Sequence, residues 1–240
     1  MTDGSTLYPG FPTQERKPLR LALMLGSHRV TTLRLVRRGV HALAEEPRAF
    51  DLLRWILEAG YRGHKVVWRR EGIVEAESIL DLGCGTGAMA GSFRPESYVG
   101  VDVNPRYIAR ARTKKSRYRF EVADGRSLPF ADGSFDAVLI GGVIHHLDDA
   151  SARAVLQESR RVLVPGRGVL VMCEAVPTRS RWNLIGRLVA ALDEGHFISP
   201  AERYLEMVYE VFGQGGVRHY PMRSGVGDAV VIVAHNRAAR

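Results

Sequence analysis

The feature that most constrains the fold of this 240-residue chain is a glycine-rich stretch, DLGCGTG, at residues 81–87. The run 78–80 before it predicts a short buried strand, and the small residues 88–91 after it predict the start of a helix. Glycine lets the backbone turn sharply and lets a ligand lie against bare main chain. A strand, a glycine turn and a helix in this order are typical of a nucleotide-cofactor site.

Two cofactor classes are compatible with this loop. Gly83, Gly85 and Ala88 match the dinucleotide fingerprint, which allows alanine at its third position. Asp102, at the end of the next apolar run, would hold ribose hydroxyls in either class. Asp81 separates the classes, because a carboxylate repels a pyrophosphate but attracts the ammonium and sulfonium groups of S-adenosylmethionine.

The spacing downstream supports one cofactor cleft. Residues 119–122 predict a third strand, which is followed by Asp124 and Gly125, and residues 135–140 predict a fourth strand, which runs into Gly141. Asp81, Asp102 and Asp124 therefore follow three successive strands. The carboxyl ends of parallel strands meet at one rim of a sheet, so these acids are expected to line a common crevice.

Several motifs in this order resemble those of a known family. Besides the glycine loop, they are FDAV at 135–138, VIHHL at 143–147 and RRVLVPGRG at 160–168. The segment from about 78 to 177 resembles the class I S-adenosylmethionine-dependent methyltransferases, and within them the small-molecule methyltransferases that carry D-x-G-C-G-x-G. The resemblance implies a Rossmann-like α/β fold: a seven-stranded, mostly parallel sheet with an antiparallel last strand, and helices on both faces.

The resemblance also assigns cofactor-binding residues. The loop under the methionine portion would be formed by Gly83, Cys84, Gly85 and Gly87, with Asp81 at the ammonium group. Asp102 and Val103 would lie at the ribose, Asp124 and Gly125 at the adenine, and Ile140 and Gly141 along the transfer channel. The expected reaction is methyl transfer to oxygen, nitrogen or carbon of a small-molecule acceptor.

Three residues are candidates for chemistry on the acceptor. His145 and His146 follow the fourth strand, and His145 is the candidate general base if the acceptor must lose a proton. Two consecutive side chains point in different directions, so only one of the histidines is expected to reach the cleft. The resemblance implies a structural or substrate-shaping role for His146. Glu174, expected at the end of the fifth strand, could bind an acceptor amine or hydroxyl. Alternatively, both histidines cap the loop or bond the backbone.

No metal site is predicted, although Asp148 and Asp149 stand beside the two histidines. Two acids directly before Ala150 and Ser151 are better explained as an N-cap and a first-turn acid of the next helix. The sequence analysis therefore assigns no residue to a metal.

The net charge of +8 leaves the partner open. Residues 16–38 and 106–119 each hold seven basic and no acidic residues, which fits either solvated helix faces or an anionic partner. The fourth strand lacks the Asn/Asp-Pro-Pro-aromatic motif used for exocyclic amines, and there is no Pro-Cys pair, so nucleic acid is the less supported acceptor. The alternatives are an RNA or tRNA methyltransferase, and a non-methylating cyclase or ligand-binding protein of the same fold.

The expected organisation has three parts. Residues 1–18 are predicted to be a flexible tail, 19–77 a helical cap with helices at 32–45 and 49–59, and 78–240 the methyltransferase domain. Within that domain we expect a helix over 150–163, a fifth strand over 169–172, two helical stretches in 177–211, and a hairpin of strands 217–222 and 229–234. No apolar run is long enough to span a membrane and no signal-peptide pattern is present, which predicts a cytoplasmic protein. The oligomeric state is left open.

Overall fold

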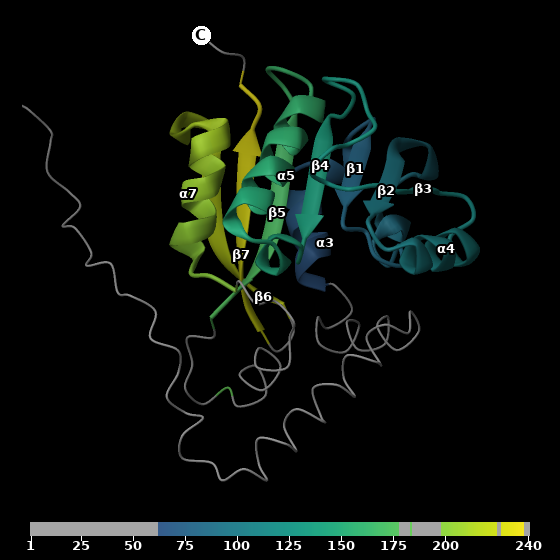
Figure 1. The fold of residues 1–240 in the computed structure, drawn as a ribbon, viewed down its shortest axis with the longest axis horizontal. Coiled ribbons are helices and arrows are strands. Elements are labelled where there is room, and N and C mark those ends of the chain that lie inside the picture. The colour runs from purple at the N-terminus through teal and green to yellow at the C-terminus, as the bar shows by residue number, and fades with distance from the viewer. Residues whose placement is uncertain (1–61, 178–182, 184–197, 225–226, 238–240) are drawn as a thin grey trace, which may run out of the picture. The chain divides into compact units, whose positions relative to one another are not determined.

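The computed structural model describes residues 62–177, 183, 198–224 and 227–237 (Figure 1). The predicted tail at 1–18 and the predicted helices at 32–45 and 49–59 lie outside these residues. The first of the two helical stretches expected in 177–211 also falls largely outside them.

The described residues form a seven-stranded sheet in the order β3-β2-β1-β4-β5-β7-β6. The strands are β1 (Ile79–Leu82), β2 (Tyr98–Asp102), β3 (Arg119–Val122), β4 (Ala137–Gly141), β5 (Val169–Val176), β6 (Val217–Ser224) and β7 (Gly227–His235). Strands β1 to β5 pair in parallel, whereas β7 is antiparallel to both β5 and β6. This arrangement confirms the predicted sheet. The strand order reverses direction between β1 and β4, which is where crevices form in open α/β sheets.

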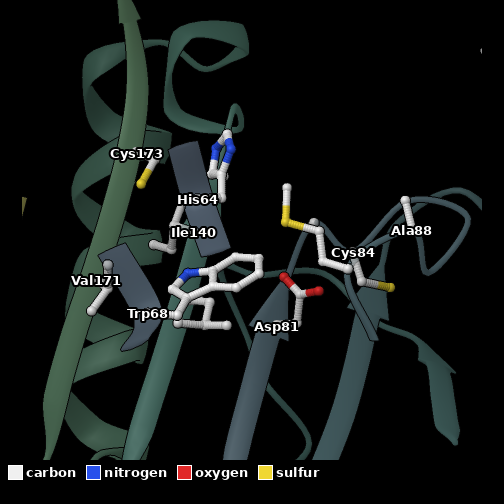
Figure 2. Close-up of a pocket in the computed structure, with 12 residues that line it drawn as sticks. His64, Trp68, Asp81, Cys84, Ala88, Ile140, Val171 and Cys173 are labelled. Atoms are coloured by element: carbon white, nitrogen blue, oxygen red, sulfur yellow. The ribbon is translucent and has the colours of Figure 1, made fainter. Parts of the chain in front are cut away.

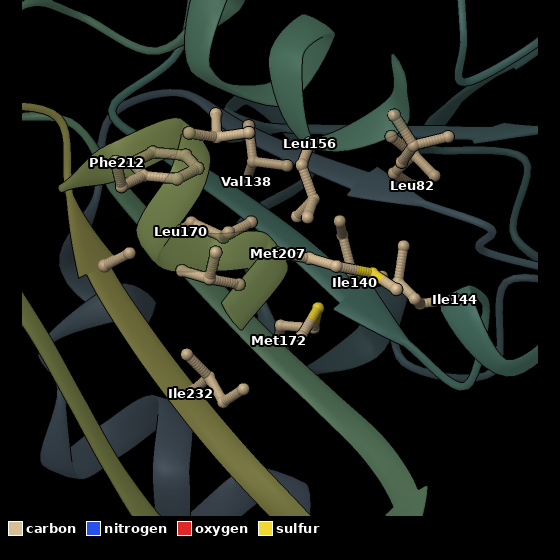
Figure 3. Close-up of a cluster of buried hydrophobic side chains, with 14 of the residues drawn as sticks. Leu82, Val138, Ile140, Ile144, Leu156, Leu170, Met172, Met207, Phe212 and Ile232 are labelled. Carbon is tan, nitrogen blue, oxygen red and sulfur yellow. The ribbon is translucent and has the colours of Figure 1, made fainter. Parts of the chain in front are cut away.

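Helices cover both faces of the sheet. They are α3 (Arg62–Arg70), α4 (Pro105–Lys114), α5 (Asp149–Val162) and α7 (Ala201–Phe212). Side chains of α5 and α7, including Leu156, Met207 and Phe212, pack on β4, β5 and β7 through residues such as Leu170 and Ile232 (Figure 3). On the opposite face, α3 and α4 bury Trp68 and other apolar side chains in a second cluster.

The helix α5 begins where the sequence predicts. The side chain of Asp148 accepts a hydrogen bond from the backbone N–H of Ser151 (2.8 Å), so Asp148 is the N-cap and Asp149 the first-turn acid. These contacts stabilise the start of the helix and explain both acids without a metal ion. No helix in the described part of the chain is both long and apolar enough to cross a membrane.

Three local predictions were wrong. The α-helix expected after the glycine loop is absent: residues 88–97 form turns and two single 3₁₀ turns, Ala90–Ser92 and Pro95–Ser97, because Gly91 and Pro95 interrupt a short connection. Strand β1 continues to Leu82, so Asp81 lies inside the strand rather than at its end. Strand β5 extends to Val176 through its pairing with β7, so Glu174 is also an interior strand residue.

Candidate cofactor and acceptor site

The glycine loop leaves β1 in a conformation that favours glycine. Gly83, Gly85 and Gly87 have φ values of 76°, 56° and 71°. A Cβ on Gly83 would lie 2.2 Å from Cγ2 of Val143, so this position also requires glycine for packing. The N–H groups of Gly83 and Cys84 both donate to the carbonyl of Val101 (2.8 and 3.0 Å), which ties the loop to β2. Glycine at position 83 is therefore required both by the backbone conformation and by the close contact with Val143, which follows β4.

Asp102, the last residue of β2, holds the other side of this loop. One of its carboxylate oxygens accepts from the N–H of Gly85 (2.9 Å) and the other from the N–H of Asn104 (2.8 Å). Asn104 in turn caps α4 by accepting from the N–H of Arg106 (3.0 Å). The neighbouring Val103 is 70% exposed. A single carboxylate thus joins the glycine loop to the start of α4.

Asp81 is a nearly buried carboxylate beside the loop, 6% exposed. Its Oδ2 accepts a hydrogen bond from the hydroxyl of Tyr98 (2.5 Å), the first residue of β2. Burial, and then the negative charge of Asp81, raise the pKa of the Tyr98 hydroxyl well above its ordinary value. The tyrosine therefore remains a hydrogen-bond donor that stabilises the carboxylate.

A pocket opens between the glycine loop, the end of β4, β5 and the inner side of α3 (Figure 2). It brings together five of the predicted residues: Asp81, Gly83, Cys84, Ile140 and Gly141. Sequence analysis missed the other lining residues: His64, Trp68, Ala88, Met89, Leu139, Val171 and Cys173. His64 and Trp68 are four residues apart on α3 and so share one side of it, a spacing that could have been noticed in an otherwise basic segment.

The pocket has an unusual charge for a nucleotide site. Among the lining residues that belong to the described part of the chain, Asp81 is the acidic one and none is lysine or arginine. Burial raises the pKa of the Cys84 thiol, and the negative charges of Asp81 and then Asp102 raise it further. Such surroundings disfavour a phosphate and suit a ligand with a positively charged group.

The other six predicted cofactor residues do not line this pocket. Gly85 and Gly87 lie further along the glycine loop. Asp102, Val103, Asp124 and Gly125 follow or end β2 and β3, the neighbouring strands on the same side of β1. Asp124 is bonded by Arg126, whose Nη2 lies 2.7 Å from Oδ2, and this interaction lowers the pKa of Asp124. Both carboxylate oxygens of Asp124 are thus already engaged by one guanidinium.

Glu174 holds the loop that follows β4. Its side chain is fully buried, and Oε1 accepts from the N–H groups of Val143 (3.0 Å) and Ile144 (2.9 Å). Its Oε2 lies 2.7 Å from Nδ1 of His145, whose side chain is 6% exposed. His146 is exposed, and its ring centroid lies 4.1 Å from that of His145. The two histidines therefore differ in environment, one buried against a carboxylate and the other open to solvent.

Comparisons with known proteins agree with this geometry. The family described as "Methyltransferase domain" matches residues 79–166. The demethylmenaquinone methyltransferase of Thermus thermophilus is 33% identical over 184 residues, which cover 68% of this chain and 80% of that protein. The chain belongs to the S-adenosylmethionine-dependent methyltransferases. The predicted enzyme class and cofactor are confirmed.

Other matches extend the likeness. The ubiquinone/menaquinone biosynthesis C-methyltransferase UbiE of Desulfotalea psychrophila is 31% identical, and the match covers 59% of this methyltransferase and 65% of that protein, just under two thirds of its length. The crystal structure of the Bacillus YcgJ protein superposes with a TM-score of 0.55 and 18% identity, over 73% of this chain and 99% of that one. The structural match confirms the predicted fold.

Proposed function

We propose that this methyltransferase methylates a ring carbon of a small hydroxylated aromatic acceptor of the quinol type. The observation that carries the proposal is the match to a demethylmenaquinone methyltransferase over 80% of that protein's length. The second relative is likewise named as a quinone-pathway C-methyltransferase. The proposal therefore narrows the predicted small-molecule acceptor to one class, the quinols.

The negative charge of the pocket matches the positively charged groups of the cofactor. Bound S-adenosylmethionine supplies an electrophilic methyl group on a sulfonium. Asp81 would attract its ammonium group, while Gly83, Cys84 and Gly141 give the cofactor close access to the main chain. Asp102 would add ribose contacts from the edge of the loop. Asp124, which follows β3 and is held by Arg126, would lie at the adenine.

A ring carbon becomes nucleophilic when a neighbouring hydroxyl loses its proton. Once the methyl group has moved from the sulfonium to that carbon, the ring C–H proton must leave to restore the aromatic ring, and the oxygen is protonated again. His146 is the exposed imidazole after β4, and we assign it the role of accepting the hydroxyl proton. His145, the base suggested by the sequence, is instead given a positioning role, because its Nδ1 is bonded to Glu174 and its ring is buried. Glu174 would act through that contact and through the amides of Val143 and Ile144.

RNA as acceptor is not favoured. Base recognition in single-stranded RNA depends on exposed aromatic side chains. None of the phenylalanine, tyrosine or tryptophan residues in the described ranges is exposed. The large apolar side chains that are exposed there are Val66, Val103 and Val122.

The test is a methylation assay of the full chain with methyl-labelled S-adenosylmethionine and a reduced demethylmenaquinone. The expected product carries the label on a ring carbon, located by fragmentation in mass spectrometry. Label on oxygen, or S-adenosylhomocysteine formed only with RNA, would contradict the proposed acceptor class.

The proton role is tested separately with His146→Ala and His145→Ala. If His146 accepts the proton, its loss should lower kcat by about 10²–10⁴-fold and flatten the pH profile, with the Kd for S-adenosylhomocysteine unchanged. His145→Ala should lower stability together with kcat, because it removes a buried contact of the loop. A pH profile that changes only in His145→Ala would return the base to that residue.

A further inference from the structure

The outward side of α3 carries a compact set of basic residues. Arg62, Lys65 and Arg69 are exposed, while His64, Val67 and Trp68 are buried on the other side. At about 100° per residue, the three basic positions and Val66 fall within an arc of about 100°. The nine-residue helix contains no acidic residue.

A second basic segment covers the same face of the sheet. Helix α4 buries Ile108 and Ala111 in the cluster that also contains Val67 and Trp68. Arg106, in its first turn, and Arg117, after its last turn, are exposed, and no acidic residue occurs between residues 103 and 120. We call Arg62, Lys65, Arg69, Arg106 and Arg117 the basic face.

The opposite face of the sheet is arranged differently. There, Arg153 on α5 pairs with Glu210, and Arg161 is bonded by Glu158 and Asp132. Arg153 and Arg161 therefore have carboxylates beside them, while Arg160, also on α5, donates to the carbonyl of Val211. The positive charge of the basic face has no such acid on α3 or in the α4 segment, and it will attract anions over roughly a Debye length.

We propose that the basic face docks this methyltransferase on an anionic phospholipid surface. Val66 is 62% exposed and lies at one edge of this arc, next to the position of Arg62. An aliphatic side chain beside lysine and arginine suits the boundary between headgroups and acyl chains. A nucleic acid would instead gain from exposed aromatic rings, and the described residues present none.

The position of α3 gives the docking a consequence for the site. Its outward side forms part of the basic face, and its inner side places His64 and Trp68 in the wall of the cofactor pocket (Figure 2). Docking would hold the wall of the pocket close to the lipid surface. Docking would bring the enzyme to an acceptor dissolved in the membrane. The docking itself goes beyond the proposed function and is argued from the basic face, whatever the acceptor.

The test measures co-sedimentation of the full chain with vesicles of phosphatidylglycerol mixed with phosphatidylcholine, and with vesicles of phosphatidylcholine alone. We expect binding to the mixed vesicles only, with the binding reduced by added salt. Since each basic residue near an anionic surface contributes about fivefold to binding, Lys65→Gln with Arg69→Gln should lower the partition coefficient about 25-fold.

The matched control is Arg167→Gln with Arg203→Gln, which removes the same charge away from α3 and α4. Both arginines pair with carboxylates, Asp136 and Asp149 respectively, and this variant should bind vesicles like the unmodified chain. An S-adenosylhomocysteine-induced rise in melting temperature in every variant would verify the fold.

Three results would overturn the proposal: equal binding to neutral vesicles, equal loss in the two double variants, or no vesicle binding at all. Binding of a single-stranded RNA oligonucleotide without vesicle binding would assign the basic face to nucleic acid. Vesicle binding is measured without turnover, so its outcome does not depend on the acceptor.

Discussion

The carboxylate of Asp102 accepts a hydrogen bond from the N–H of Gly85 at 2.9 Å, so the predicted ribose acid is also a structural part of the glycine loop. Its other oxygen bonds the N–H of Asn104, the N-cap of α4. One side chain therefore fixes the loop, the strand end and the following helix. The shape of the loop and the position of a ribose-binding group consequently depend on the same residue.

Asp102→Ala should weaken S-adenosylhomocysteine binding by about 1.5–3 kcal/mol, through the loss of charge-assisted hydrogen bonds. It should also lower the melting temperature of the cofactor-free protein, because two backbone donors lose their acceptor. Calorimetry and thermal melting measure the two effects. Asp102→Asn, which keeps one oxygen acceptor, should show a smaller loss of stability. An unchanged dissociation constant in Asp102→Ala would mean that the ribose is held elsewhere.

Gly83→Ala should destabilise the protein and reduce cofactor affinity. The new Cβ would lie 2.2 Å from Cγ2 of Val143, at a backbone φ of 76°. We expect a loss of about 1–3 kcal/mol in the free energy of unfolding, measured with urea. Val143→Ala removes the steric partner but not the backbone strain, so the double variant should recover part of the loss. Additive losses in the double variant would show that the contact with Val143 is not the cause.

The sheet could be predicted because its evidence is local. The apolar run at 98–101 and the alternating apolar residues at 119–122 mark strands, and the order of motifs fixes the connections. The failures were also local. Sequence periodicity does not show that β5 continues to Val176, because Glu174 to Val176 lie beyond the pairing with β4 and pair with β7.

The site was predicted where residues are consecutive and missed where packing assembles it. Loop residues such as Gly83 and Cys84 lie in one motif, so their meeting in a pocket could be foreseen. Trp68 and Cys173 come from distant elements, and only the folded sheet brings them to the same wall. The contrast between buried His145 and exposed His146 depends on Glu174, 29 residues further along the chain from His145.

Glu158 should make the protein sensitive to acid. Its carboxylate accepts from Arg161 (2.7 Å) and from the N–H of Leu128 (2.7 Å), and the bond from Arg161 lowers its pKa below the ordinary value of 4.5. Its contribution to stability is therefore complete above about pH 4.5 and is lost as the pH falls toward the lowered pKa. Glu158→Gln should cost about 1–3 kcal/mol at neutral pH, with the difference narrowing in acid. Urea unfolding at several pH values measures this, and a difference independent of pH would contradict it.

Tyr98 should give the opposite dependence, at alkaline pH. Its hydroxyl donates to Asp81 (2.5 Å), and burial raises its pKa well above the ordinary value of 10.0. Because the neutral form is favoured in the folded protein, this stabilisation is complete below pH 10 and is lost as the pH rises above it. Tyr98→Phe removes the titrating group and leaves the nearly buried Asp81 without this donor, which should cost about 1–3 kcal/mol at neutral pH. The difference in unfolding free energy between the two proteins should shrink above pH 10, whereas the titration of Tyr220, common to both, should cancel. A constant difference up to the pH of alkaline unfolding would show that the pKa of Tyr98 is not raised in the folded protein.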